Sequence, residues 1–528
     1  MQNQAKPQRL TTLTWVLLWA SLLVTFVLTL PGFSEFDASK YVSIAQQMIN
    51  KHSYLLAHWE GHPYSDKPPL FFWLIILGWK LFGTYNWWPQ LIVLFLATAS
   101  ILISQRIAKS LWPTEMNCHR VTPFILIGCF YWVWFAKEIR VDAILVFATL
   151  LCLYSVIRII QGKKAYWLLY VLGVGLGGFA KGPVILVFIL LPTLFLPVLF
   201  AKENNFSPKW YAFLGLTTIF GLSLPLLWAI PAAMLGGKTF TYEIFYDQIA
   251  HRAHQKHESI WFYLLRLPIW LLPWTIYPAL WRNLSRITLR EKPQGEMICL
   301  VIITCGLLVF SVFGQKLPHY LYPLFPILAI LIARIVTLPS PFHARDHWPI
   351  ALFILSFALF CFFYPTISFW FSDNLYIRGY FLQEIDLTSW GIFFFVIAIA
   401  ALFLRTKTPL GQIILITFLS VLTTLFVNNI VLARYQSHLN PRPMLEQIQH
   451  IPHDQLAILA DATIENHSLQ NYLRVHPIRK LTTHQLAEWR TLHPHAWLLT
   501  TRISDLQKTY PRVWYYQTRY SIVALISL

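Results

Sequence analysis

Charged side chains are concentrated in the segment 33–70, which lies between two apolar runs of the sequence. They include Glu35, Asp37, Lys40, Lys51, Asp66 and Lys67. An ionised group beside apolar chain needs a partner, a path to solvent or a function. A carboxylate in such a place can take the proton of a hydroxyl group, and an ammonium group can bind a phosphate. This segment is therefore the first candidate for a reactive site.

Asp37 is the candidate general base of the segment, because it follows the first apolar run by only a few residues. The same residue precedes the amphipathic stretch 38–50, and aspartate is a favoured N-cap of a helix. Considered alone, Asp37 is open to both interpretations. The motifs that follow favour the catalytic one.

Three later motifs each place a lysine beside a proline at the end of an apolar run. They are Lys67-Pro68-Pro69, Lys181-Gly182-Pro183 and Lys316-Leu317-Pro318. Proline disfavours helix directly before it, so such a lysine stands where a new helix begins and exposes its N-terminal amides. Lysines that extend to the membrane surface beside a turn are the structural alternative. A shared anionic ligand, such as a lipid phosphate, explains all three motifs together.

Two further segments combine acids with basic residues at the ends of apolar runs. In the segment 137–142, Arg140 and Asp142 either pair as a structural turn or contribute to a site, and both interpretations stay open. The segment 243–261 is rich in histidine and acids and includes Arg252 and His257. Its spacing matches no closed zinc motif, so a solvated loop is the simpler interpretation there.

The composition indicates that membrane helices position these residues. The chain has 528 residues, of which 56% are hydrophobic and 12% are charged, whereas a soluble protein carries about 25% charged residues. The net charge of +18 is compatible with nucleic-acid binding, but the basic residues fall in short clusters between apolar runs and form no single face. Positive-inside topology and anionic lipid explain that distribution better.

Thirteen apolar runs have roughly the 17–25 residues that a membrane-spanning helix needs. They cover residues 13–31, 88–106, 121–137, 142–159, 166–180, 183–201, 211–231, 266–282, 297–314, 318–336, 348–371, 388–405 and 409–431. Basic residues collect in alternate connections, which places the N-terminus in the cytoplasm and the segment 32–87 outside. The apolar stretch 68–82 is short, and we interpret it as an interfacial or re-entrant helix.

Hydropathy falls after residue 431, and short apolar patches then alternate with polar stretches. This pattern predicts strands and helices of a small α/β domain, and it contains no glycine-rich nucleotide motif. The sequence thus predicts an all-α polytopic membrane domain over residues 1–431, with the outer loop 32–87. A small periplasmic α/β domain is expected over residues 432–528.

Taken together, the motifs resemble those of the membrane glycosyltransferases that include the aminoarabinose lipid A transferases and the protein O-mannosyltransferases. The motifs are FDASKY (36–41), GHPYSDKPPL (61–70), KEIRVDAIL (137–145), GFAKGPV (178–184), HESIWFY (257–263), LLPW (271–274) and KLPHYLYPLFPILA (316–329). The resemblance spans the first 430 residues or so. It implies the GT-C fold with about thirteen transmembrane helices, and a polyprenyl-phosphate sugar as the donor.

The resemblance also implies roles for single residues. Asp37 matches the catalytic base, although Ala38 stands where the family commonly has glutamate, and Asp142 would orient the acceptor or the sugar. The implied donor-binding residues are Lys40, Tyr41, Lys67, Lys181, Arg252, Lys316 and Tyr320. Asp66 and His257 match positions that can hold a divalent metal ion, zinc or magnesium. No nucleotide is expected.

These expectations describe an inverting glycosyltransferase at the periplasmic face of the bacterial inner membrane. It would move a monosaccharide from its lipid carrier to a hydroxyl or phosphate group of lipid A, another envelope glycan or a protein. We expect it to work in the lipid bilayer as a monomer, without nucleic acid. The alternatives are a transporter or flippase for lipid-linked sugars and an enzyme like an O-antigen ligase. Transporters tend to carry ionisable groups at mid-membrane, whereas here these groups collect at one surface.

Overall fold

The computed structural model describes most of the chain. The described residues are 2–28, 36–59, 62–200, 209–247, 258–286, 294–371, 387–428, 444, 447–448, 450–459, 478–493, 496–500, 513–517 and 522–527. They fall into two compact units. The first contains residues 1–28, 41–352 and 400–425, and the second contains residues 29–40, 353–399 and 426–528. Each unit is considered by itself.

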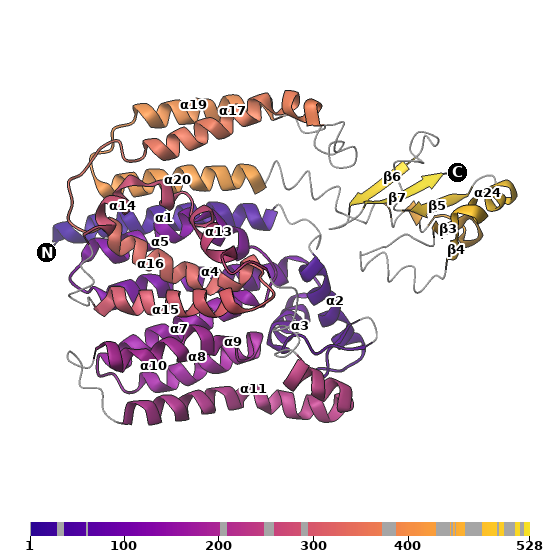
Figure 1. The fold of residues 1–528 in the computed structure, drawn as a ribbon, viewed down its shortest axis with the longest axis horizontal. Coiled ribbons are helices and arrows are strands. Elements are labelled where there is room, and N and C mark those ends of the chain that lie inside the picture. Colours follow the sequence, from indigo (N-terminus) through magenta and orange to yellow (C-terminus); the bar gives the residue numbers. More distant parts are fainter. Residues whose placement is uncertain are drawn as a thin grey trace. The chain divides into compact units, whose positions relative to one another are not determined.

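The first unit is built almost entirely of helices (Figure 1). Those wholly or mainly within it are α1 (Gln2–Leu28), α2 (Phe36–Asn50), α3 (Leu70–Phe82), α4 (Trp87–Leu111), α5 (Met116–Gly128), α6 (Phe130–Ala136), α7 (Asp142–Ile160), α8 (Tyr166–Lys181), α9 (Val184–Phe188), α10 (Leu190–Leu199), α11 (Lys209–Tyr242), α13 (Phe262–Trp270), α14 (Pro278–Leu284), α15 (Gln294–Val312), α16 (Phe325–Val336) and α20 (Pro409–Phe426). Shorter turns are η1 (Glu243–Asp247), η2 (Trp274–Ile276) and η4 (Pro318–Leu324).

Seven helical segments of the described chain are long and apolar enough to cross a membrane. They are Leu10–Val27, Trp87–Leu111, Asp142–Ile160, Lys209–Tyr246, Gln294–Val312, Pro318–Val336 and Pro409–Phe426. Five shorter apolar helices of 10–17 residues accompany them. The chain is thus the polytopic helical membrane protein that the sequence predicts, while the count of thirteen spans stays a prediction.

Some predicted spans are interrupted. The run 266–282 forms α13, η2 and α14 in place of one helix, because Pro268, Pro273 and Pro278 each remove a backbone N–H donor. The run 121–137 is likewise divided into α5 and α6 at Cys129, which has an extended backbone. The run 183–201 is divided into α9 and α10 at Ile189.

The two short helices expected in the segment 32–87 are present, and their place at the membrane surface stays a prediction. Helix α3 has 13 residues and a length of about 20 Å, which is too short for a hydrocarbon layer of about 30 Å. In α2, Tyr41, Ile44, Ala45 and Met48 are buried on one face, as the amphipathic pattern predicts.

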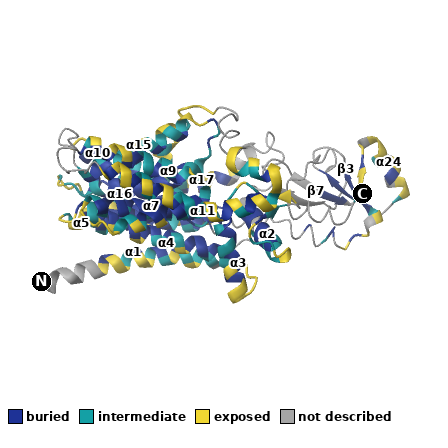
Figure 2. Cartoon of the chain, turned by 90° about the horizontal axis from the view of Figure 1, so that it is seen from below, coloured by how far each residue is buried: buried dark blue, intermediate teal, exposed yellow. Residues whose placement is uncertain are grey.

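Burial separates central from peripheral helices (Figure 2). The segment Pro318–Val336, which ends in α16, is 83% buried, whereas Lys209–Tyr246, which contains α11, is 28% buried. Because α11 exposes large apolar side chains such as Leu227 and Met234, its outer face is suited to contact lipid.

Glycines allow α7, α8 and α11 to pack closely (Figure 1). A Cβ added to Gly173 of α8 would lie 2.4 Å from Cys152 Sγ of α7, and one added to Gly178 would lie 2.6 Å from Pro225 Cγ of α11. Gly182 then ends α8 with a φ of 64°, a conformation that favours glycine. This packing fixes the end of α8 that carries Lys181.

The second unit includes most of α17 (Trp348–Phe371) and α19 (Thr388–Phe403) and a C-terminal sheet with helix α24 (Thr483–Leu492). The strands are β3 (Leu456–Leu459), β4 (Arg479–Leu481), β5 (Trp497–Thr500), β6 (Val513–Gln517) and β7 (Ile522–Ser527). Their order is β4-β3-β5-β7-β6. Strand β3 is parallel to β4 and β5, whereas β7 is antiparallel to β5 and β6. The predicted α/β character of this region is confirmed, and its boundary at residue 432 stays a prediction.

Candidate functional site

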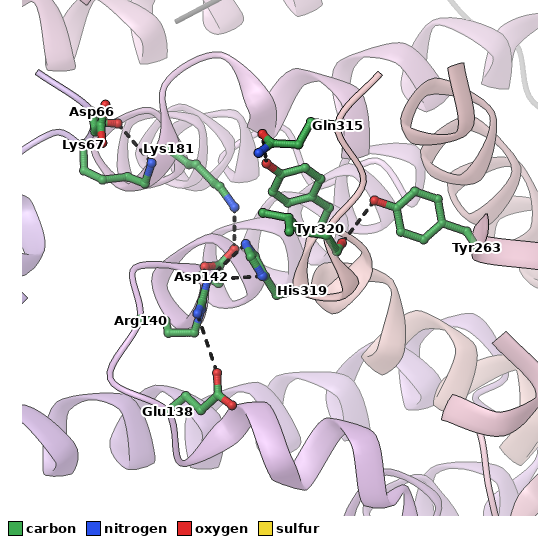
Figure 3. Close-up of polar contacts among 11 residues, drawn as sticks. Asp66, Lys67, Glu138, Arg140, Asp142, Lys181, Tyr263, Gln315, His319 and Tyr320 are labelled. Atoms are coloured by element: carbon green, nitrogen blue, oxygen red, sulfur yellow. Dashed lines mark hydrogen bonds and ion pairs between the residues drawn. The ribbon is translucent and has the colours of Figure 1, made fainter. Parts of the chain in front are cut away.

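A buried carboxylate at the start of α7 contacts two cations. The Oδ1 atom of Asp142 lies 2.6 Å from Nζ of Lys181, and its Oδ2 atom lies 3.5 Å from Nε of Arg140 (Figure 3). The side chains of Asp142, Lys181 and Arg140 are only 3%, 7% and 14% exposed. Ion pairs in such a place interact strongly, because little water screens them.

The topology of one helical hairpin brings Asp142 and Lys181 together. Asp142 is the first residue of α7 and Lys181 is the last residue of α8, and the short connection 161–165 joins the other ends of these helices. Two antiparallel helices of similar length return the chain to the face where it began. A pair 39 residues apart in sequence therefore meets at one end of the hairpin.

Arg140 extends the cluster from Asp142 to two more side chains. Its guanidinium lies 3.8 Å from a carboxylate oxygen of Glu138. Its Nη2 atom lies 3.0 Å from Nε2 and 3.2 Å from Nδ1 of His319, which belongs to η4. A guanidinium group only donates hydrogen bonds, so a His319 nitrogen can accept from Arg140 only where that nitrogen carries no proton.

Tyr320, the neighbour of His319, forms a second wall beside Lys181. The Lys181 ammonium lies 4.8 Å from the centre of the Tyr320 ring, a favourable cation–π arrangement. The Tyr320 hydroxyl bonds to Gln315 Oε1 at 3.2 Å. Tyr263 of α13 donates to the Leu317 carbonyl at 3.1 Å, which fixes the turn before η4 (Figure 3).

The loop before α3 brings a second lysine toward the cluster. Lys67 Nζ donates to the Asp66 carbonyl at 3.1 Å and lies within electrostatic range of His319. The neighbouring Ser65 donates to the Glu243 carboxylate of η1 at 2.8 Å. This bond connects the loop to the end of α11, so Asp66 and Lys67 are held from both sides.

A family model described as dolichyl-phosphate-mannose-protein mannosyltransferase matches residues 66–228, the part of the chain that contains Lys67, Arg140, Asp142 and Lys181. The undecaprenyl phosphate-alpha-4-amino-4-deoxy-L-arabinose arabinosyl transferase of Enterobacter sp. (strain 638) is 25% identical over 333 residues, which is 61% of this chain and 59% of that protein. The homologous enzyme of Edwardsiella ictaluri is 27% identical over 60% of this chain and 59% of its own length. Each match covers about three fifths of the length of the relative.

A solved structure shows the same fold over nearly the whole chain. The crystal structure of ArnT from Cupriavidus metallidurans bound to undecaprenyl phosphate has a TM-score of 0.73 and 17% identity, and the match covers 97% of this chain and 98% of that one. The chain therefore has the fold of that ArnT structure. The resemblance of its motifs to those of the aminoarabinose and mannosyl transferases is therefore confirmed.

Of the residues that the GT-C resemblance singles out, the structure brings Lys67, Asp142, Lys181 and Tyr320 into one region beside Arg140 and His319. Asp66 belongs to the same loop as Lys67. Their roles in the reaction stay predictions.

Tyr41 and Lys316 have partners of another kind. Tyr41 is buried, with its ring centre 6.0 Å from that of Phe71 and 5.8 Å from that of Phe72, so it packs α2 against α3. Lys316 is buried, and its ammonium donates to the carbonyls of Glu258 at 2.9 Å and Phe313 at 2.8 Å. These two bonds fix the turn that precedes η4.

The remaining predicted site residues are Asp37, Lys40, Arg252 and His257. Asp37 lies in the first turn of α2, and its side chain is outside the described residues. Lys40 is buried but belongs to the second unit. Arg252 and His257 are outside the described residues. No three His, Cys, Asp or Glu side chains within the described part of the chain gather as a metal site.

Sequence reasoning missed His319 and Gln315 as members of the site, and it left Glu138 without a role. Glu138 and His319 lie within motifs that the sequence singles out, and Gln315 directly precedes one of them. His319 contacts Arg140, which lies 179 positions away in sequence. Glu138 and Gln315 contact Arg140 and Tyr320 within their own segments. The position of His319 between two other motif residues, Lys316 and Tyr320, is the one signal that could have found it.

Proposed function

We propose that this chain is a glycosyltransferase that moves a monosaccharide from a polyprenyl-phosphate carrier to a hydroxyl or phosphate group at the periplasmic membrane surface. Lipid A is the acceptor that the names of the relatives favour. Another envelope glycan or a protein is the alternative acceptor. The related ArnT structure binds undecaprenyl phosphate, which makes that lipid the first donor carrier to test.

The observation that carries the proposal is the buried cluster of Lys181, Arg140 and Asp142 at one end of the α7–α8 hairpin. The basic residues Lys163 and Lys164 lie in the connection at the opposite end of this hairpin. By the positive-inside rule that connection faces the cytoplasm, so the cluster faces the periplasm. Lipid-linked phosphate at the outer surface can reach cations held in this position.

The proposed reaction exchanges one glycosidic bond for another. An acceptor oxygen attacks the anomeric carbon while the bond from that carbon to the phosphate oxygen breaks, and the electron pair leaves with the lipid phosphate. Lys67, Lys181 and Arg140 stabilise the charge that develops on this leaving group. Asp37 receives the acceptor proton, and attack from the side opposite the phosphate inverts the configuration.

The general base gives the most direct test of the proposal. The Asp37→Asn variant should insert and bind undecaprenyl phosphate but lose transfer by at least about a hundredfold, the usual contribution of a general base. Transfer is measured in proteoliposomes with a radiolabelled lipid-phosphate sugar and lipid A. Near-normal transfer by this variant would remove Asp37 from the mechanism.

The rival functions give different results in the same vesicles. A flippase would move the lipid-linked sugar between leaflets without forming a glycosylated acceptor. An enzyme like an O-antigen ligase would prefer a lipid diphosphate glycan to a monophosphate sugar. Mass spectrometry of lipid A and surface glycans after deletion of the gene identifies the acceptor class in cells.

A metal cofactor held by Asp66 and His257 is a separate proposal, which rests on the family resemblance. A divalent ion there would neutralise negative charge beside the donor. No three such ligands gather within the described residues, and His257 lies outside them. The steps above assign roles to the chain's own side chains.

A further inference from the structure

Lys181, the most deeply buried cation of the proposed donor site, already has an anionic partner. Its ammonium lies 2.6 Å from Asp142 Oδ1 and 4.8 Å from the centre of the Tyr320 ring. Both members of the ion pair are more than nine-tenths buried. A phosphate that binds Lys181 therefore meets the Asp142 carboxylate at the same ammonium group.

The ionic groups of the cluster and of the neighbouring loop balance one another. Lys181, Arg140 and Lys67 carry three positive charges, and Asp142, Glu138 and Asp66 carry three negative ones. The phosphodiester of a lipid-phosphate sugar adds one negative charge. Its repulsion with a carboxylate that contacts the same ammonium group is large where water is excluded.

Arg140 offers the displaced carboxylate an alternative partner. Its Nε atom already lies 3.5 Å from Asp142 Oδ2, and a guanidinium group has five donors in a planar fork. His319 and Glu138 contact the Nη atoms of the same group, which holds it beside Asp142. A small rotation of the carboxylate would exchange the ammonium for the guanidinium without leaving it unpaired.

We propose that Asp142 occupies, in the protein without donor, the position on Lys181 that the donor phosphate takes, and that binding of the phosphate transfers Asp142 to Arg140. This inference rests on the proposed function, because it concerns the same donor site. It predicts a change of unusual sign: removing the negative charge of Asp142 strengthens donor binding. A purely structural role for the ion pair predicts the opposite.

The experiment compares undecaprenyl phosphate binding by purified wild-type, Asp142→Asn and Asp142→Glu proteins in nanodiscs, measured by titration calorimetry. The Asp142→Asn variant should bind about tenfold more tightly, since it removes one anion from a poorly screened site. Asp142→Glu retains the charge and should bind no more tightly than the wild type. Tighter donor binding should lower KM. Sugar transfer by Asp142→Asn should fall, which lowers kcat.

Other outcomes separate the two proposals. Wild-type protein that fails to bind undecaprenyl phosphate overturns the proposed function and this inference with it. Wild-type binding combined with equal or weaker binding by a folded Asp142→Asn variant overturns the exchange alone. Thermal unfolding of each variant shows whether it is folded.

A second measurement does not require the variant to fold. In wild-type protein labelled with ¹³C-aspartate, undecaprenyl phosphate should shift an aspartate carboxylate band in the infrared difference spectrum, because Asp142 changes its partner. The shift should be absent with an uncharged polyprenol of the same chain length. An aspartate region that stays unchanged when the phosphate binds contradicts the exchange.

Discussion

Two buried lysines that the sequence treats alike have different surroundings in the structure. Lys181 faces a carboxylate and an aromatic ring, whereas Lys316 donates to two main-chain carbonyls. A main-chain carbonyl that loses its donor destabilises the fold, and a cation removed from a ligand site weakens binding. The two residues therefore form a natural pair for separating stability from donor recognition.

Replacing Lys316 by methionine should mainly affect stability. The change removes the donor of the Glu258 and Phe313 carbonyls, and each lost hydrogen bond costs about 0.5–1.5 kcal/mol. We expect a lower Tm in detergent and retained undecaprenyl phosphate affinity. Normal stability combined with lost affinity would instead make Lys316 a donor contact, as the family resemblance implies.

Lys67→Ala should weaken donor binding without comparable loss of acceptor binding. Lys67 lies in a loop anchored by the Ser65–Glu243 hydrogen bond, so the fold should tolerate the change. Losing one charge-assisted hydrogen bond to phosphate corresponds to about 1.5–3 kcal/mol, or roughly ten- to a hundredfold in affinity. Titrating donor and acceptor separately checks this, and an effect confined to the acceptor would contradict a phosphate contact.

At the scale of elements, the α7–α8 hairpin determines where the reactive cluster forms. Gly178 of α8 faces Pro225 of α11, and a rigid proline ring cannot move aside as a flexible side chain would. Gly178→Ala should therefore separate the two helices, lower the Tm and reduce transfer by displacing Lys181. Gly215→Ala in α11 is the matched control, because a Cβ there meets nothing within 4 Å.

Alanine is intrinsically a better helix former than glycine, so helix propensity favours both variants. A loss of stability in Gly178→Ala alone can therefore be assigned to the clash with Pro225. Gly→Ala in an open helical position stabilises by about 0.5–1 kcal/mol. A Gly178→Ala protein as stable and active as the Gly215→Ala control would show that α8 can shift without disturbing the site.

Sequence patterns predict elements here better than they predict partners. Amphipathic periodicity predicts α2, a short apolar run predicts α3, and lysine–proline motifs single out Lys67 and Lys181. The ion pair of Asp142 with Lys181 joins residues 39 positions apart, and only the packed hairpin determines it. His319 was missed for the same reason, since its contact with Arg140 spans 179 positions. The prolines of the run 266–282 indicate that it is divided into shorter helices, whereas its hydropathy alone indicates a single span.

At the scale of the whole molecule, the metal proposal predicts an effect of chelation. If Asp66 and His257 hold a divalent ion that neutralises charge near the donor, 1,10-phenanthroline or EDTA should lower transfer, and added zinc or magnesium should restore it. The Asp66→Asn variant, which loses a ligand charge, should bind less metal by elemental analysis. Full transfer by metal-free protein would show that the cations of the chain suffice.

The orientation of the first unit across the membrane gives the broadest prediction. The connection 161–165 and the turn before α13 lie on opposite faces if the α7–α8 hairpin crosses with its basic turn in the cytoplasm. Residues Lys164 and Ser259 occupy these two places, and both are in described surface segments. Five of the six native cysteines are buried, and Cys305 is intermediate. Labelling of a single introduced cysteine can therefore be distinguished from the low labelling of the native thiols.

A Ser259→Cys variant should react with a membrane-impermeant maleimide in intact spheroplasts, whereas Lys164→Cys should react only after the membrane is permeabilised. The parent protein, measured under both conditions, gives the background from the native thiols. The reverse pattern would place the cluster of Asp142, Arg140 and Lys181 at the cytoplasmic face. A periplasmic lipid-phosphate sugar could then not reach it, and the direction of the proposed reaction would have to be inverted.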